Sequence, residues 1–285
     1  MNFNSYWYLG LGIISLLLVV YVCIKNRSIR SLLLFFAMIG IGYLIEIVIY
    51  IFLGSYQYYP KFIAHDPYYD SNTGAIASNA LALPAAATFI AVFRLRWIWL
   101  IFITGFFVGI EWIFLNLGIY THNWWRLEYT ALSLPVYFAA AIMLYPLILK
   151  PIKGVIHFLL LQLIIGPVTG TLHILPIMFF SNRYYRPGWF ESQAHDTTAF
   201  SAVYYMCAST LLIVMVKLHW KYGWLKYVLI LAGVTVMTII LKAAGILYSF
   251  VWWDPFYYVL LPIVVLIIAE AVNKRLSIGP VSRKH

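Results

Sequence analysis

The chain has 285 residues, of which 64% are hydrophobic and only 10% are charged. An ordinary soluble domain carries about 25% charged residues, and a soluble fold could not cover this much apolar surface. The composition therefore excludes a soluble globular protein and indicates an all-α, polytopic membrane protein.

Apolar runs of 17 residues or more recur along the whole chain, and each is long enough to cross a hydrocarbon core of about 30 Å. They predict nine transmembrane helices, at 6–24, 31–53, 75–93, 97–118, 130–149, 154–180, 197–216, 225–246 and 256–273. The first run lacks a preceding basic region and an A-x-A site, so we interpret it as an uncleaved helix. The long run at 154–180 contains Gly166-Pro167, Gly170 and Pro176, which predict a kink or a break.

Basic residues mark one side of the predicted membrane. The connections at 25–30, 94–96, 150–153 and 217–226, with the tail from 274, hold 14 of the 19 Lys and Arg and no Asp or Glu. Because loops rich in Lys and Arg stay in the cytoplasm, this pattern predicts a plasma-membrane protein with an outside N-terminus and a cytoplasmic C-terminus. The net charge of +10 then reflects topology and not nucleic-acid binding. The expected partner is the lipid bilayer, including anionic lipid at the basic side.

The sequence matches itself at one constant offset. The aligned pairs include Tyr58 with Tyr185, Pro60 with Pro187, Arg94 with Lys221, Trp97 with Trp224, Gly118 with Gly245, and Leu134-Pro135 with Leu261-Pro262. Interfacial aromatic residues are common to helical membrane proteins, but they do not explain the aligned Pro and Gly positions. A tandem duplication explains both.

The duplication predicts four parts of the chain. They are an N-terminal transmembrane helix at 1–30, a four-helix repeat at 31–149, a second four-helix repeat at 154–273, and a basic cytoplasmic tail at 274–285. Four spans return the chain to its starting side, so the two copies have the same orientation. We expect a pseudo-twofold axis along the membrane normal to relate them.

An acidic-Trp pair, a Gly-aromatic turn and a W-(R/K)-x-x-Y-(S/T)-x-x-x-x-P run follow one another in EWIFLNLGIYTHNWWRLEYTALSLPVYF, Glu111 to Phe138. This segment resembles an uncharacterised family of small polytopic membrane proteins of spore-forming Gram-positive bacteria, whose members correspond to about one repeat. The resemblance implies an architecture and a bacterial origin, with this chain as a doubled version, and no activity. A weaker resemblance is to lycopene-cyclase-type membrane domains, but Leu134-Pro135 is not followed by their two glutamates.

Four ionisable residues lie within predicted spans: Glu46, Glu111, His173 and Lys242. A charge at the bilayer centre costs ~2.5–3.5 kcal/mol on insertion scales, so such groups face protein and need partners. The offset of the repeat places Glu46 opposite His173. We therefore expect Glu46 to pair with His173, and Glu111 with Lys242, between the two copies.

Aromatic residues crowd the outer connections, among them Trp124, Trp125, Trp252 and Trp253. An aromatic belt is normal at a membrane interface, but the inner connections are much poorer in aromatics. We hypothesise that these tryptophans and the four ionisable residues form a ligand-binding site. The chain shows no soluble catalytic motif, and we predict no metal and no cofactor.

Three functions stay open. The one we favour is binding or transport of a small amphipathic or lipid molecule, at an outer-leaflet site between the two repeats. The second is a membrane-embedded enzyme of cyclase or isomerase type, acting on a lipid or isoprenoid with Glu46 or Glu111 as acid and His173 as base. In the third, the chain is a structural membrane scaffold whose buried charges pair between helices. The sequence assigns neither catalytic residues nor an oligomeric state.

Overall fold

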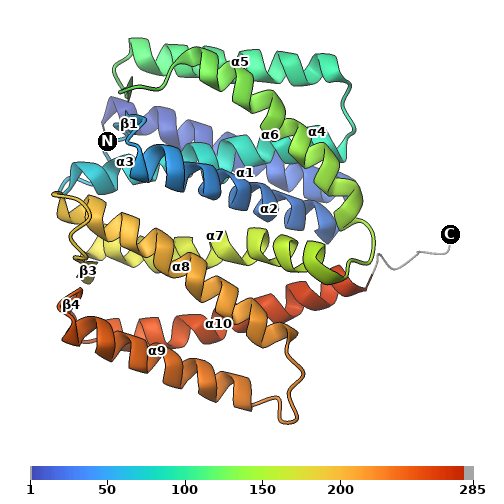
Figure 1. Ribbon diagram of the computed structural model, residues 1–285. Coiled ribbons are helices and arrows are strands. Elements are labelled where there is room, and N and C mark those ends of the chain that lie inside the picture. Colours follow the sequence, from blue (N-terminus) through green and yellow to red (C-terminus); the bar gives the residue numbers. More distant parts are fainter. Residues whose placement is uncertain (1, 279–285) are drawn as a thin grey trace. The chain divides into compact units, whose positions relative to one another are not determined.

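The computed structural model describes residues 2–278, which form helices, four strands of three residues and the connections between them (Figure 1). Within these residues, nine helices are long and apolar enough to cross a membrane: Phe3–Asn26, Ile29–Phe52, Pro67–Val92, Trp97–Asn116, Leu127–Ile148, Gly154–Phe180, Gln193–Lys217, Leu225–Ala243 and Asp254–Ser277. This confirms the predicted all-α class and the number of apolar helices, although the third begins at Pro67 and not at 75. The helices form two compact units, one within residues 1–152 and one of residues 153–278.

The first unit contains six α-helices and two π-helical segments. In chain order they are α1 (Phe3–Asn26), α2 (Ile29–Glu46), η1 (Ile47–Phe52), α3 (Pro67–Ala75), η2 (Ile76–Ala82), α4 (Leu83–Val92), α5 (Trp97–Asn116) and α6 (Leu127–Ile148). The segment η1 extends α2, and η2 joins α3 to α4, so each π-helical turn lies inside one long apolar helix. Strands β1 (Tyr56–Tyr58) and β2 (Tyr120–His122) pair antiparallel.

The second unit contains four α-helices and its own antiparallel strand pair. These elements are α7 (Gly154–Phe180), β3 (Arg183–Tyr185), α8 (Gln193–Lys217), α9 (Leu225–Ala243), β4 (Leu247–Ser249) and α10 (Asp254–Ser277). Helix α7 continues through Pro167 and Pro176, so the break predicted there is wrong. A proline removes one backbone hydrogen bond of an α-helix. The hydrogen bonds before and after each proline are enough to keep α7 continuous.

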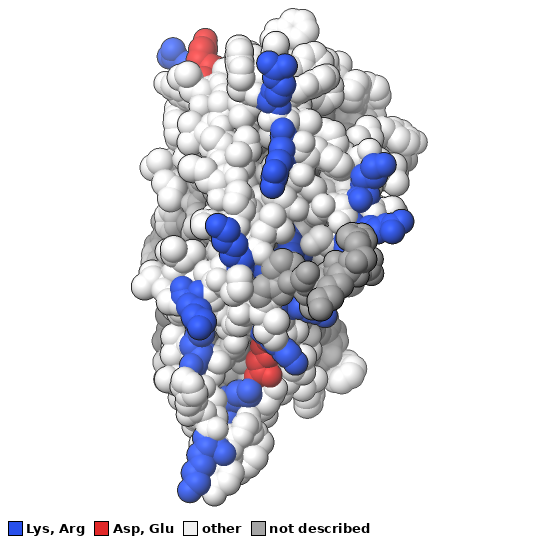
Figure 2. All heavy atoms as spheres, turned by 90° about the vertical axis from the view of Figure 1, so that its right-hand side faces the viewer, with Lys and Arg blue, Asp and Glu red and all other residues white. Residues whose placement is uncertain are grey.

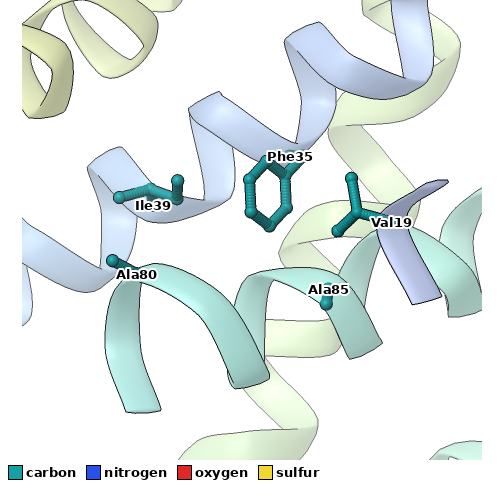
Figure 3. Close-up of a cluster of buried hydrophobic side chains, with 5 residues drawn as sticks. All are labelled: Val19, Phe35, Ile39, Ala80 and Ala85. Carbon is teal, nitrogen blue, oxygen red and sulfur yellow. The ribbon is translucent and has the colours of Figure 1, made fainter. Parts of the chain in front are cut away.

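Helix α1 packs along one face against other helices of the first unit. Its Val19 contacts Phe35 and Ile39 of α2 together with Ala80 and Ala85, as Figure 3 shows. The alanines carry small side chains, which let neighbouring helices approach closely. The expected N-terminal helix is therefore part of the core of this unit.

Backbone hydrogen bonds of the first unit recur in the second, each at the offset that aligns Tyr58 with Tyr185. In each bond the first residue donates its N–H and the second accepts at its carbonyl. The matched bonds, first unit before second, are Tyr59–Ile119 with Arg186–Ile246, Asn123–Ser55 with Phe250–Asn182, Ile119–Phe114 with Ile246–Leu241, and Gly118–Leu115 with Gly245–Lys242. Gly118 and Gly245 both adopt a positive φ, of 65° and 68°, where glycine has no steric cost. The connections between helix and strand therefore have the same backbone hydrogen bonds, and the same glycine conformation, in both units.

One aspartate holds the loop after the first strand in each unit. Asp70 accepts hydrogen bonds from three successive backbone N–H groups, and Asp196 does the same in the second unit. The donors are Lys61, Phe62 and Ile63 for Asp70, and Gly188, Trp189 and Phe190 for Asp196. Both aspartates are buried, and these bonds compensate the burial of their carboxylates.

The basic residues of the first unit gather at one end of its helices. The connections α1–α2 and α4–α5 lie at the end opposite the strands (Figure 1), and each carries Lys or Arg. Figure 2 views this side of the molecule, where basic side chains far outnumber acidic ones. The segregation of charge predicted from the sequence is therefore present in the folded unit.

Substitution of Gly74 by Ala is expected to destabilise the protein. Gly74 lies on α3 against β1, and a Cβ there would lie 2.4 Å from Cβ of Tyr58, which is part of the strand and cannot move away. Overpacking of this kind typically costs ~1–3 kcal/mol. The matched control is Gly109→Ala, because a Cβ at Gly109 meets nothing within 4 Å. Thermal unfolding of the purified variants in detergent should show a lower midpoint for Gly74→Ala only, and equal midpoints would contradict this packing.

Candidate functional site

Glu46 and Glu111, the two acids predicted to lie within transmembrane helices of the first unit, contact the β1–β2 strand pair. The hydroxyl of Tyr56 on β1 donates to Oε1 of Glu46. On β2, Nε2 of His122 lies 2.7 Å from Oε1 of Glu111 and forms an ion pair when the ring is protonated. Tyr56 and His122 are directly opposite each other in the strand register. One cross-strand residue pair of this small sheet therefore contacts both of these acids.

We expected these acids to pair with His173 and Lys242 of the second copy. Each instead has a partner within its own unit, ten residues after Glu46 and eleven residues after Glu111. The physical reason is proximity, because each acid lies near the helix end from which the chain turns directly into the strand. Pairing between the two copies stays a prediction.

A cavity of about 160 Å³ lies between these residues. Its polar wall contains both acids and the three tyrosines of the strands, Tyr56, Tyr58 and Tyr120. The rest of the wall is mostly apolar and comes from every α-helix of the unit except α3 and from both π-helical segments: Leu11, Ile45, Ile49, Ala82, Leu83, Phe107, Ile110, Phe114 and Leu134 are among its residues. A cavity of about 150 Å³ holds a molecule of the size of benzene. The space therefore suits a small molecule with one polar end.

One carboxyl oxygen in the cavity lacks a partner. Glu46 is only 8% exposed, and its Oε2 has no hydrogen-bond partner among the described residues. More than 90% of buried polar groups in proteins are paired, and an unpaired one costs ~1–3 kcal/mol. Glu46 also lines the cavity, so its carboxyl group is a candidate to bind a molecule there.

Both π-helical segments border the cavity. Segment η1 begins directly after Glu46 and contributes Ile49, and η2 contributes Ser78, Asn79 and Ala82. The π-helical turn is rare and occurs frequently at functional sites. In the second unit the corresponding helices α7 and α8 are α-helical throughout. The irregular helices thus belong to the unit that has the cavity described here.

Aromatic rings surround the polar end of the cavity. The ring of Tyr56 lies 5.6 Å from that of Tyr50, 5.4 Å from that of Tyr120 and 5.8 Å from that of Trp125, measured between centroids. Burial, reinforced by the nearby Glu46, raises the pKa of the Tyr56 and Tyr58 hydroxyls well above the ordinary value. These hydroxyls therefore stay protonated and can donate to a carboxylate or to a ligand.

The second unit has an ion pair where the first has Tyr56. Arg183 occupies the equivalent strand position in the repeat and binds Asp254 with two hydrogen bonds of 2.8 and 2.7 Å. Its guanidinium carbon lies 3.3 Å from the ring centroid of Tyr258. Arg183 is 3% exposed and Asp254 is fully buried. In a buried ion pair with two hydrogen bonds, the attraction between the two charges and the hydrogen bonds offset the cost of removing both charges from water.

The predicted base, His173, belongs to this same buried network. Its Nε2 lies 3.2 Å from the hydroxyl of Tyr185, which also accepts a hydrogen bond from Arg183. Burial raises the pKa of Tyr185 to about 12, although the positive charge of Arg183 opposes part of the rise. His173 is 3% exposed. This arrangement matches the structural role that the sequence left open for the buried charges.

The eight residues predicted for the site are therefore found in different environments. Glu46, Glu111 and Trp125 line the cavity. Trp124 is exposed and donates to the carbonyl of Leu53. The remaining four belong to the second unit: His173 is buried, Lys242 and Trp252 are exposed, and Trp253 packs against Phe180.

The sequence reasoning missed Tyr56 and His122, the partners of the acids. One pattern in the sequence could have indicated these partners. A polar residue follows each intramembrane acid by ten or eleven positions, and the offset of the repeat aligns these two residues with Arg183 and Ser249. No group of three or more His, Cys, Asp or Glu within residues 2–278 is placed to hold a metal ion. The chain contains two His-Asp pairs, His65-Asp66 and His195-Asp196, in which Asp66 caps α3 and Asp196 holds a loop.

Asp254→Asn is expected to destabilise the protein strongly. The change leaves the buried Arg183 without its countercharge, and breaking a buried pair typically costs ~3–5 kcal/mol. The double variant Arg183→Met with Asp254→Leu should lose less stability, because it removes both charges together. Arg186→Gln, at an exposed arginine three positions along, is the control and should change little. Thermal unfolding midpoints test this order, and a double variant worse than Asp254→Asn would contradict it.

Comparison of the chain with protein-family models, with curated proteins and with solved structures gave no match. Its function is therefore inferred from the geometry and chemistry of the site.

Proposed function

We propose that the nine apolar helices cross the plasma membrane, with the N-terminus outside and the C-terminus in the cytoplasm. The exposed surfaces of these helices are apolar: Phe102, Leu132 and Val155 are 65%, 72% and 74% exposed. Apolar surface on this scale is unfavourable in water and favourable in lipid. The gathering of basic residues at one end of the first unit supports the orientation.

Cysteine labelling tests this topology. In a background with Cys23→Ser and Cys207→Ser, a membrane-impermeant maleimide added to intact cells should label Ala64→Cys and Glu191→Cys. It should spare Lys150→Cys until the cells are permeabilised, which controls for the reactivity of that site. All three positions are exposed in the structure. The reverse pattern of labelling would refute the proposed orientation.

We further propose that the chain is a tandem duplication, with copies at 31–149 and 154–273 in the same orientation. The support is the set of backbone hydrogen bonds that recurs at the constant offset of the repeat, and the two aspartates that each hold three N–H groups. Shared aromatic composition would not reproduce a hydrogen-bond pattern. In this proposal α1 precedes the first copy and packs against it.

We propose that the first unit binds a small amphipathic molecule in its cavity. The observation that carries this proposal is the unpaired Oε2 of Glu46, which is buried in the wall of a cavity that also contains Glu111. A purely structural carboxylate would be fully paired, as Asp254 is in the second unit. The site lies within the first unit, whereas we expected it between the repeats.

The shape of the cavity wall supports an amphipathic ligand. Glu46 and Tyr56 meet at the wall beside the strand pair, and Tyr58 and Tyr120 of the same strands also line the cavity. Apolar side chains of α1, α5 and α6 make up much of the remaining wall. Ligand pockets are typically built in this way, mostly apolar with a few placed polar groups that orient the ligand.

A second candidate is a membrane-embedded enzyme acting on a lipid or isoprenoid. It is favoured by one observation, that two carboxyl groups line the same cavity, each beside a group able to exchange a proton. General acid–base catalysis needs such pairs within reach of the substrate. Incubation of the protein with membrane lipid extract distinguishes the candidates, because an enzyme gives a new product and a binding protein returns the extract unchanged.

Binding can be measured with benzene-sized probes. Isothermal titration calorimetry of the protein in phosphatidylcholine nanodiscs, titrated with benzylamine, benzyl alcohol and benzoate, should show saturable binding of at least one probe above empty nanodiscs. Ala82→Leu should abolish that binding, because the larger side chain occupies the cavity. The matched control is Ala243→Leu, at an exposed position on α9. Absence of saturable binding by all three probes would refute the proposed site.

A further inference from the structure

The wall of the cavity contains two acidic residues, and only one of them has a neighbouring side chain that can carry a positive charge. Glu46 and Glu111 line it, and none of its described lining residues is Lys or Arg. Glu111 has His122 beside it, 2.7 Å away, which can supply a positive charge. Glu46 has only the neutral hydroxyl of Tyr56. The cavity therefore has one carboxylate without a countercharge.

The charge of a ligand decides how well it fits this wall. A buried carboxyl group without a countercharge ionises only at a cost, so a cationic group that reaches the carboxyl of Glu46 relieves two costs, that of ionisation and that of the missing hydrogen bond. A neutral donor relieves only the second. An anion would relieve neither, and either acid would repel it when ionised. Charge complementarity therefore favours a cation over a neutral molecule, and a neutral molecule over an anion.

The aromatic wall favours the same charge. Tyr56, Tyr58, Tyr120 and Trp125 line the cavity beside the acids, and the faces of aromatic rings attract cations. The ring centroids of Tyr58 and Tyr120 are 4.8 Å apart, so these rings form one packed group. Carboxylate and aromatic faces together are the surroundings in which proteins hold ammonium groups.

The second unit shows this chemistry with a cation of its own chain. At the strand position equivalent to Tyr56, the guanidinium of Arg183 lies between the ring of Tyr258 and the carboxylate of Asp254. The shared backbone of the two units thus accommodates a buried cation beside its strand pair. At the equivalent position of the first unit the chain has the uncharged Tyr56.

We propose that the cavity of the first unit binds a small amphipathic amine, whose ammonium group donates to Oε2 of Glu46 and whose apolar body lies against α1, α5 and α6. This proposal rests on the binding function proposed above and adds the chemical class of the ligand. The volume of about 160 Å³ limits the ligand to roughly the size of one ring with a short side chain. Glu111 is held by His122 and contributes a second acceptor at the wall.

The test compares three probes of nearly equal shape on the wild-type protein. Benzylamine carries a positive charge, benzyl alcohol none and benzoate a negative one, so differences in affinity report charge. A hydrogen bond to a charged group contributes enough to expect binding of benzylamine at least about tenfold tighter than that of benzyl alcohol. Nanodiscs of phosphatidylcholine alone, and empty nanodiscs as the blank, remove attraction of the amine to anionic lipid.

Variants then assign the preference to Glu46. Glu46→Gln should weaken benzylamine at least about tenfold and leave benzyl alcohol within about twofold, while Glu46→Asp should keep the preference for the amine. Glu270→Gln is the matched control, because Glu270 pairs with Lys226 in the second unit and does not line the cavity. Thermal unfolding of each variant identifies any that fail to fold, and the wild-type probe series does not depend on them.

The outcomes separate this inference from the function on which it rests. Equal affinity of the wild type for benzylamine and benzyl alcohol would overturn the amine proposal and leave the binding site standing. Tighter binding of benzoate would overturn it as well. If no probe binds saturably, the binding function itself fails and the amine proposal fails with it.

Discussion

The site of the first unit depends on the pairing of two strands of three residues. Backbone N–H and C=O groups at the ends of buried helices must find partners, and here the two connections satisfy each other through β1 and β2. Side chains of a strand alternate between its faces, so Tyr56 and Tyr58 are both buried while Gln57 between them is not. The alternation of side chains on β1 thus places the hydroxyls of Tyr56 and Tyr58 at the cavity. On the partner strand β2, His122 lies next to Glu111.

The same backbone supports opposite chemistry in the two units. Where the first has Glu46, Tyr56 and Leu127, the second has His173, Arg183 and Asp254. In the second unit, the long arginine side chain binds its aspartate and covers a tyrosine ring, so its charges are neutralised within the protein. In the first unit the tyrosine is shorter and uncharged, and a carboxylate oxygen beside the cavity stays without a partner. These three side chains are among the differences that accompany the change from a paired network to one with an unpaired oxygen.

Much of the fold could be predicted from the sequence, because the features that define it are long. Runs of about twenty apolar residues and the distribution of Lys and Arg are averages over many positions, and single irregularities such as Pro167 do not change them. The importance of Glu46 and Glu111 also followed from the cost of burying charge. Their partners did not, because Tyr56 and His122 lie in connections whose path depends on a strand register that no local pattern encodes. The π-helical turns were missed for a similar reason, since they require packing and not composition.

The pair formed by Arg183 and Asp254 also constrains how the second unit can change over generations. Either side chain alone in that buried position is a charge without a partner, so each one-step route back towards an uncharged pair passes through a less stable chain. Selection removes such intermediates when they fall below the stability that folding requires. The buried pair therefore restricts which substitutions the second unit can accept one residue at a time.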